Sequence, residues 1–360
     1  MKGFRAELLR VKFSWCVPVP TPGLELMYAG AAKAEACGFW SIWYADHLTM
    51  IPPGGGQVFE AWSFLTALAC KTKRVKLCTG VSDVHRIHPA VMAQKVATLD
   101  QISGGRAMIG VGLGEAMNLD AYGLPRSASL GKLREFVEVM RLLWGKRRKA
   151  TFEGSHFNLK RAYLQVHPVG HVPVYVAANG PKSRRLAGEV GDGWYPFFES
   201  PETFAKHKRD VDAGISASKD PEEKAGRYDY AYNCFVAVAD DHDAAVERLR
   251  FFKSMCVSMP QKFNEAYGLD LPTNLHLHDV TMESEGADAL LSCADQVPDR
   301  ALEDFNVAGT VDEVIAQVER FQKAGCTHLV LMNRGPDVNR VYEVFRDEVI
   351  PAFQDPEDQG

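Results

Sequence analysis

The stretch VKLCTGVSDVHRIHPAVMAQKVATLDQISGGRAMIGVGLGEAMN (75–118) contains one complete repeat of the fold. Its apolar run at 75–81 predicts a strand, the proline-led segment 89–102 predicts a helix, and 106–112 predicts the next strand. Strands that are apolar throughout are typical of a parallel sheet with helices on both faces. The stretch therefore predicts a strand, a crossover helix and a second, parallel strand.

The same alternation continues in both directions along the chain. Further strands are predicted at 11–19, 39–45, 172–178, 192–197, 230–238 and 327–332, and further helices at 24–37, 59–71, 132–144, 181–190, 201–217, 241–255, 310–324 and 338–353. Eight strands, each followed by a helical segment, predict an α/β protein of the (β/α)8 TIM-barrel class. A doubly wound open sheet is the alternative, but the GxGxxG turn that would follow its first strand is absent from CVPVPTPG (16–23).

Two segments interrupt the repeat within a single domain that spans residues 1–360. Residues 151–168 predict a short hairpin before strand five, and residues 257–310 form the longest insertion, before the last crossover helix and strand eight. Long loops inside a compact domain are usually functional or disordered. We therefore expect 257–310 to fold over the barrel as a substrate lid.

Composition excludes several classes of protein. The 41 Lys+Arg and 46 Asp+Glu residues give a net charge of −5 without a block of like charge, which argues against nucleic acid as a partner. No apolar run approaches the roughly 18 residues of a membrane span, and the N-terminus has no secretory pattern. The eight cysteines lack metal or disulfide spacing. These features predict a cytoplasmic protein with reduced thiols.

No metal site is expected either. His85 and His88 are three residues apart, but no further ligand is in register with them. We assign these two histidines to the surface or to the start of a helix.

Polar residues follow the predicted strands two to five, where barrel enzymes place their active sites. His47 directly follows strand two, and a histidine can pass a proton in either direction near neutral pH. Glu115 follows three glycines at 110, 112 and 114, which we expect to let the backbone approach a flat ligand. The alternatives are structural: a histidine satisfied by neighbouring backbone, and an acidic residue at a helix N-terminus.

Two further groups of residues follow strands in the same way. Asp46 precedes His47 and could serve as a helix N-cap. The sequence VAANGPKS (176–183) ends strand five and enters a helix through a proline, so its backbone N–H groups could hold a phosphate. An ordinary helix start is the alternative for this segment.

Taken together, ADHL (45–48), TGVSD (79–83), residues 88–118 and VPVYVAANGPKSRRLAGEVGDGWYP (172–196) resemble the luciferase-like (β/α)8 family, in its branch that uses the deazaflavin coenzyme F420. The resemblance resumes at 308–331. Within the branch, the chain is most similar to enzymes of the phthiodiolone ketoreductase type and to F420-dependent glucose-6-phosphate dehydrogenases.

The resemblance implies roles for individual residues. His47 matches the proton-transferring histidine, and Glu115 matches the acidic residue that faces it across the cofactor. A non-proline cis peptide is implied between Gly80 and Val81. The implied cofactor-binding residues are Asp46, Thr79, Gly80, Val81, Asp83, Leu113, Gly114, Asn118, Ala177, Ala178, Asn179, Gly180, Lys182 and Ser183.

The implied activity is hydride transfer between carbon 5 of F420 and a carbonyl, alcohol or methylene-pterin substrate, in a homodimer. The alternatives are an FMN-dependent monooxygenase and an F420-binding protein without turnover. Trp15, Ile51, Phe197 and Phe198 predict an apolar substrate pocket. Asp304 stands near the place of an arginine that binds sugar phosphate in the dehydrogenases, which opposes a phosphorylated substrate.

Overall fold

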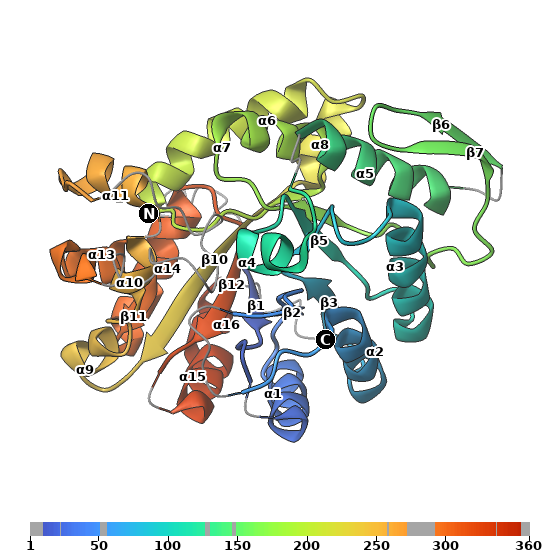
Figure 1. The fold of residues 1–360 in the computed structure, drawn as a ribbon. Helices are drawn as coiled ribbons and strands as arrows, with labels where there is room; N and C mark the ends of the chain where they lie inside the picture. The colour runs from blue at the N-terminus through green and yellow to red at the C-terminus, as the bar shows by residue number, and fades with distance from the viewer. Residues whose placement is uncertain are drawn as a thin grey trace, which may run out of the picture.

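The computed structural model describes residues 10–353 except 22, 51–55, 127–129, 146–148, 258, 272–291 and 336. A parallel barrel with surrounding helices occupies the centre of the molecule (Figure 1). Its strands are β1 (Lys12–Cys16), β2 (Ser41–Tyr44), β3 (Lys76–Thr79), β5 (Ile109–Gly112), β8 (Val174–Val176), β9 (Gly193–Trp194), β10 (Asp229–Val238) and β12 (His328–Asn333). The predicted barrel class is confirmed.

The strands pair in the order β3-β2-β1-β12-β10-β9-β8-β5, with the short β4 (Ser82–Asp83) beside β5. The bridge Leu77–Ala107 joins β3 to the start of β5. Across it, the Leu77 N–H donates to the Arg106 carbonyl at 2.9 Å and the Met108 N–H donates to the Leu77 carbonyl at 2.8 Å. These bonds close the ring, and the carboxyl ends of all its strands open at one end, which we call the mouth.

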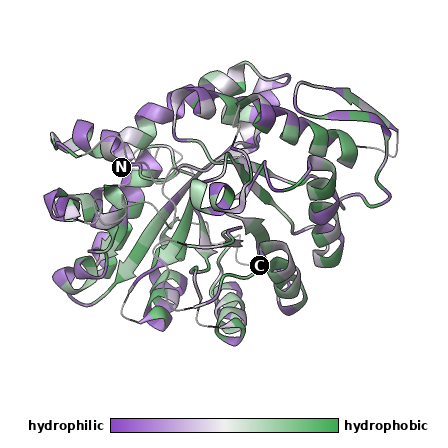
Figure 2. Ribbon diagram, viewed as in Figure 1, coloured by the Kyte–Doolittle hydropathy of each residue, from purple (hydrophilic) through white to green (hydrophobic). Residues whose placement is uncertain are grey.

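Helices return the chain from each strand to the next. The principal ones are α1 (Leu24–Ala36), α2 (Ala61–Lys71), α3 (Pro89–Ser103), α5 (Leu130–Trp144), α6 (Pro181–Val190), α7 (Pro201–Ser216), α14 (Val311–Lys323) and α15 (Val338–Val344). Figure 2 shows apolar barrel strands and helices whose polar residues face outward. In α3, Pro89 opens the first turn, the His88 ring accepts from the Ala90 N–H at 3.1 Å, and Gly104 ends the helix in the left-handed conformation. The predicted helix-start role of His88 is confirmed.

The segments between these elements contain shorter helices and turns. They are α4 (Ala116–Leu119), η1 (Asp120–Tyr122), α8 (Pro221–Arg227), α9 (His242–Glu247), α10 (Phe252–Cys256), α11 (Pro260–Tyr267), η3 (Ala294–Gln296), α13 (Arg300–Asp304), η4 (Phe345–Val349) and α16 (Ile350–Phe353). The expected hairpin is present as β6 (Ala150–Glu153) and β7 (Asn158–Ala162).

Two predicted boundaries differ from the structure. The helix predicted at 241–255 is divided into α9 and α10 by a turn. Within the predicted insertion 257–310, β11 (Val307–Gly309) adds to the sheet beside β10. A strand of three residues is too short to show an alternation of its own.

The barrel interior is filled in two layers. At the closed end, the Asp229 carboxylate accepts from Tyr175 Oη at 2.7 Å and from Thr327 Oγ1 at 2.6 Å, and it contacts His328 Nδ1 at 3.0 Å. Above this polar layer, an apolar cluster that includes Trp43 and Tyr195 forms the floor of the mouth. The barrel is therefore a packed core, and chemistry is confined to the mouth.

Among the described residues, no helix is both long enough and apolar enough to cross a membrane. The eight cysteines are free thiols, six of them buried.

Candidate active site

His47 and Glu115 meet at the mouth. His47 follows β2, Glu115 precedes α4 after β5, and His47 Nε2 lies 3.5 Å from Glu115 Oε2. Their side chains are 17% and 29% exposed, so both remain accessible to a ligand. The other ring nitrogen of His47 contacts the Met50 sulfur at 2.8 Å. A thioether is a weak acceptor, which leaves Nε2 as the nitrogen that exchanges a proton.

The His47–Glu115 distance has a consequence for binding. A flat ring that lies between two side chains needs them about 7 Å apart, twice an ordinary van der Waals contact. The resemblance implies such a ring between these two residues. At 3.5 Å, at least one of the two side chains has to rotate before a ring enters.

Asn118 fixes the loop that carries His47. Its side-chain oxygen accepts from the Leu48 N–H at 2.7 Å and from the Thr49 N–H at 3.1 Å. Asn118 is buried in α4, the helix that Glu115 precedes. One amide group therefore ties the loop after β2 to the loop after β5.

Asp46 and Asp83 are held by an arginine that the sequence did not assign to the site. Arg86 contacts Asp46 Oδ1 at 3.0 Å and also pairs with Asp83. The Ser82 hydroxyl donates to Asp46 at 2.5 Å, and Asp83 Oδ1 accepts from the His85 N–H at 2.7 Å. Both carboxylates are thus occupied by protein partners. The sequence did contain a signal for the Arg86–Asp83 pair, because Arg86 follows Asp83 by three residues, a spacing that allows an ion pair.

A bulge connects β3 to β4 beneath the mouth. The Gly80–Val81 peptide bond is cis. The buried Thr79 hydroxyl donates to the Gly110 carbonyl at 3.1 Å, which joins the bulge to β5.

The glycines of β5 have a steric role that the sequence did not predict. A side chain on Gly110 would strike the Thr79 carbonyl and the Val81 side chain, and one on Gly112 would lie 2.8 Å from Val81. These two positions make room for the bulge, and that they also let the backbone approach a flat ligand stays a prediction. Gly114 has φ +78, a left-handed conformation that favours glycine.

The segment after β8 lies beside this group. Ala178 is buried and its carbonyl accepts from the Trp194 ring N–H at 2.8 Å, while the Asn179 oxygen accepts from the Phe197 N–H at 3.2 Å. Helix α6 begins after Gly180, which offers no side-chain cap, and Lys182 is exposed. Backbone N–H groups in such an uncapped first turn are available to an anion.

Most predicted residues therefore come together at the mouth. The loops after β2, β3 and β5 are joined by the contacts above, and β8 pairs directly with β5. Leu113 is half-buried against the main core, and Ala177 lies beside Gly112. The Ser183 hydroxyl donates to the Gly180 carbonyl at 2.9 Å.

The predicted substrate pocket is partly wrong. Trp15 packs against Phe39 and Tyr342 on the helix-facing side of β1, because inward-facing positions of this strand are those of Ser14 and Cys16. Phe198 is buried beside Phe252, whereas Phe197 is only partly covered. Ile51 lies outside the described residues.

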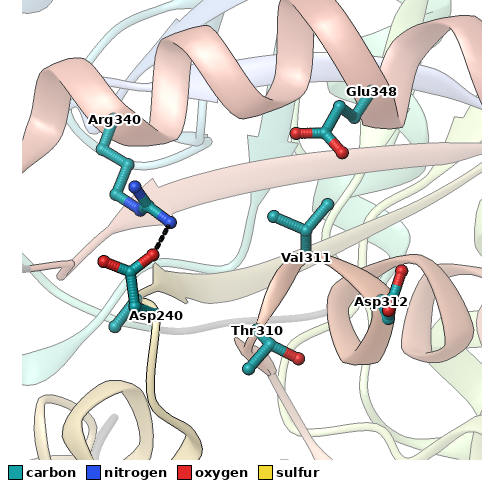
Figure 3. A pocket seen from close by; sticks show the side chains of 7 residues that line it. Asp240, Thr310, Val311, Asp312, Arg340 and Glu348 are labelled. Atoms are coloured by element: carbon teal, nitrogen blue, oxygen red, sulfur yellow. Dashed lines mark hydrogen bonds and ion pairs between the residues drawn. The ribbon is translucent and has the colours of Figure 1, made fainter.

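A second hollow lies on the outer rim and does not extend the mouth. It is lined by Asp240, Asp312, Arg340 and Glu348, and Arg340 is paired with Asp240 (Figure 3). None of the predicted site residues lines it. Within the described part of the chain, no cluster of three or more His, Cys, Asp or Glu side chains is arranged to hold a metal ion.

Comparisons with known proteins agree with this arrangement. The family model described as luciferase-like monooxygenase matches residues 13–328. The chain is 31% identical over 328 residues to a 5,10-methylenetetrahydromethanopterin reductase of Archaeoglobus fulgidus, covering 89% of this chain and 93% of the relative. It is 33% identical over 333 residues to an F420-dependent glucose-6-phosphate dehydrogenase of Kineococcus radiotolerans, covering 90% and 91%.

A solved structure of an F420-dependent enzyme is also similar to this chain. An F420-dependent secondary alcohol dehydrogenase in complex with an F420-acetone adduct superposes with a TM-score of 0.81 at 29% identity, covering 96% of this chain and all of that one. The family match extends over most of the barrel. This chain belongs to the luciferase-like monooxygenase family.

Proposed function

We propose that this protein is an F420-dependent oxidoreductase that transfers a hydride between carbon 5 of the deazaflavin and a carbonyl or alcohol carbon of a small molecule. The observation that carries the proposal is the His47–Glu115 pair at the mouth. It stands in a chain whose relatives include F420-dependent dehydrogenases and an F420-dependent alcohol dehydrogenase.

The residues present suit such a cofactor. F420 is an anion with a flat ring, and the uncapped start of α6 together with the exposed Lys182 offers donors and a positive charge to its anionic part. The apolar floor that includes Val81 and Ala177 offers a surface to the ring. Binding of the anion thus rests on local groups, since the net charge of the whole chain is −5.

When bound, F420 supplies the hydride chemistry. The protein positions the substrate and transfers the proton to or from the substrate oxygen. In alcohol oxidation, His47 Nε2 accepts the hydroxyl proton, and in ketone reduction it returns a proton to the carbonyl oxygen. The Glu115 carboxylate, which would face His47 from the other side of the bound ring, stabilises the positive charge that the imidazole carries when it is protonated.

The substrate class is narrowed by the wall of the mouth nearest β9. Lys262 in α11 donates to Glu199 at 2.8 Å and to the Phe198 carbonyl at 3.1 Å, so its charge is already compensated. Asp304 accepts from the Tyr267 hydroxyl at 2.8 Å, and its carboxylate compensates the charge of Arg320 at 3.8 Å. We therefore favour a ketone, an alcohol or a reduced pterin over a sugar phosphate.

The remaining features stay predictions. They are a homodimer, a cytoplasmic location and a lid formed by 257–310. In the described part of that segment, α11 and α13 pack with Phe198 and Phe235, which lie after β9 and within β10. This placement supports a role for the segment in shaping the mouth.

The roles of the two residues are tested with His47→Ala and Glu115→Gln. We expect each variant to bind F420 with nearly unchanged affinity and His47→Ala to reduce ketones about 10² to 10⁴ times more slowly, the usual contribution of a general acid. His88→Ala, which alters a histidine at the start of α3, is the matched control. Unchanged rates in both site variants would contradict the assigned roles, and turnover by neither wild type nor control would favour a protein that only binds F420.

A further inference from the structure

Arg334 is an inward-facing residue at the mouth that the mechanism above does not use. Along β12, Val330 and Met332 belong to the cluster inside the barrel, whereas Leu329 and Leu331 belong to the core outside it. Side chains alternate between the two faces of a strand. Arg334, two residues beyond Met332, therefore continues the inward column at the carboxyl end of β12.

The guanidinium of Arg334 packs into a corner formed by two aromatic rings. It lies 5.4 Å from the centre of the Phe235 ring and 4.8 Å from that of Phe251. The two ring centres are 4.9 Å apart and the rings are nearly perpendicular, at 86°. Both rings thus lie to one side of the guanidinium and hold its orientation, and no other aromatic ring of the described residues is stacked on it.

The charge of Arg334 has no protein partner among the residues that the structure describes. Its Nε is buried without a hydrogen bond, and no ion pair joins its guanidinium to a described carboxylate. Two buried arginines differ: Arg184 donates to Asp210 at 2.7 Å, and Arg106 donates to the Val75 carbonyl at 2.8 Å. Burial lowers the pKa of Arg334. A buried donor without a partner is costly, so a ligand that supplies an acceptor would recover this free energy.

The position of Arg334 separates it from the residues assigned to the cofactor. Those residues follow β2, β3, β5 and β8, whereas Arg334, Phe235 and Phe251 belong to β10, β12 and the segments after them. β12, which leads into Arg334, pairs with β1 on one side and with β10 on the other. Arg334 therefore lies across the mouth from the strands that carry the predicted cofactor residues.

We propose that Arg334 binds a carboxylate of the substrate, so that the substrates of this enzyme are oxo acids or hydroxy acids. This inference rests on the proposed function, because it names the substrate class of the same mouth. A guanidinium presents two parallel N–H donors that match the two oxygens of a carboxylate. A phosphate dianion suits the site less well, since one guanidinium compensates only half of its charge.

The reaction in this form is balanced. The carbonyl carbon of the oxo acid receives the hydride of reduced F420, and its oxygen receives a proton from His47. The ring N–H proton that reduced F420 loses on oxidation passes to solvent, from which His47 recovers its proton, so the products are the hydroxy acid and oxidised F420. The carboxylate remains ionised and bound throughout.

The test compares levulinate, an oxo acid, with its methyl ester, which keeps the ketone and removes the charge. In the wild type loaded with reduced F420, we expect kcat/KM for levulinate to exceed that for the ester by about 10- to 100-fold, the range of a hydrogen-bonded ion pair. In Arg334→Gln, kcat/KM for levulinate should no longer exceed that for the ester. The value of kcat/KM for the ester should stay within about threefold of the wild-type value. Arg334→Lys, which keeps the charge without the paired donors, should retain part of the preference for levulinate.

Arg250→Gln is the matched control, because Arg250 is an exposed arginine close in sequence to Phe251 that pairs with Glu247 at 2.9 Å. This variant should have the same kcat/KM as the wild type for levulinate and for the ester. Equal kcat/KM for acid and ester in the wild type would overturn the proposal, and so would parallel losses for both substrates in Arg334→Gln, since these indicate a structural role.

A binding measurement separates this inference from the proposed function. Levulinate is titrated calorimetrically into the protein loaded with oxidised F420, a complex that cannot turn over. Binding that Arg334→Gln abolishes would support the carboxylate site even if no ketone were reduced. Reduction of neutral ketones together with no binding of levulinate would support the oxidoreductase and overturn the role of Arg334.

Discussion

At the scale of single residues, the two carboxylates beside His47 depend on one guanidinium. The side chains of Asp46 and Asp83 are 8% and 6% exposed, and Arg86 contacts both. Burial alone lowers the pKa of Arg86, but the two carboxylates outweigh it and hold that pKa above its usual value. Removal of one partner from a buried charge network leaves the others uncompensated.

Arg86→Gln is therefore expected to lower the free energy of unfolding by about 3 to 5 kcal/mol. Urea denaturation at neutral pH measures this change. Lys95→Gln is the control, because Lys95 pairs with Glu60 at 3.4 Å on the surface and such pairs contribute about 1 kcal/mol or less. Equal, small losses in the two variants would show that the Arg86 contacts are not stabilising.

Sequence reasoning located His47, Glu115 and the residues around them because catalytic groups of a barrel lie just after its strands, and chain order alone reveals which residues those are. It did not assign Arg86 or Arg334. The role of Arg86 depends on Asp46, which is distant from it in sequence. The role of Arg334 depends on a buried Nε that has no hydrogen-bond partner among the described residues. Neither condition is visible before the fold is known.

At the scale of elements, β5 and the bulge between β3 and β4 fit together only because β5 carries glycine. The space that a Gly110 side chain would need is taken by the Thr79 carbonyl and the Val81 side chain. Gly110→Ala should therefore lower the free energy of unfolding by about 1 to 3 kcal/mol. It should also weaken F420 binding, since the bulge lies among the predicted cofactor residues.

Gly226→Ala is the matched control for this prediction. Gly226 lies in α8, and no atom lies within 4 Å of the position of an added methyl group. The same substitution should leave stability unchanged or slightly raised there. Thermal unfolding measures the stability of the two variants, and F420 titration measures their affinity for the cofactor. A Gly110→Ala protein with wild-type stability and wild-type affinity would show that β5 tolerates a side chain.

The longer elements followed from hydrophobic periodicity, but three features did not. β11 has three residues, the turn between α9 and α10 interrupts an otherwise helical pattern, and η4 is a π-helical segment inside the last helical stretch. Each of them is set by tertiary contacts over a few residues. The direction of Trp15 was missed for a similar reason, because a strand with apolar residues on both faces does not reveal which face is inside.

At the scale of the whole molecule, the closed end of the barrel depends on Asp229. Burial alone would raise the pKa of Asp229, but His328, Lys12 and the Thr327 hydroxyl outweigh it and hold the pKa far below its usual range. A carboxyl group with a lowered pKa stabilises the fold above its unfolded pKa of about 3.9. That contribution is lost as the pH falls from about 4 through the lower, folded pKa.

Asp229→Asn should accordingly be less stable than the wild type at pH 7. Its urea midpoint should also fall less steeply between about pH 4 and pH 2, since this group no longer takes up a proton on unfolding. Asp312→Asn, on the surface of α14, changes the net charge equally and is the control. Identical acid profiles for wild type and Asp229→Asn would contradict the assignment.

The central claim is that this barrel transfers hydride to and from F420. It is tested most directly by mixing the anaerobic wild-type protein with reduced F420 and a ketone and following the absorbance at 420 nm, with FMNH2 and oxygen in a parallel sample. We predict that oxidised F420 appears in step with the alcohol product and that the FMN sample consumes no oxygen above its background. Oxygen consumption with FMNH2, together with no reaction of reduced F420, would contradict the claim and identify a flavin monooxygenase.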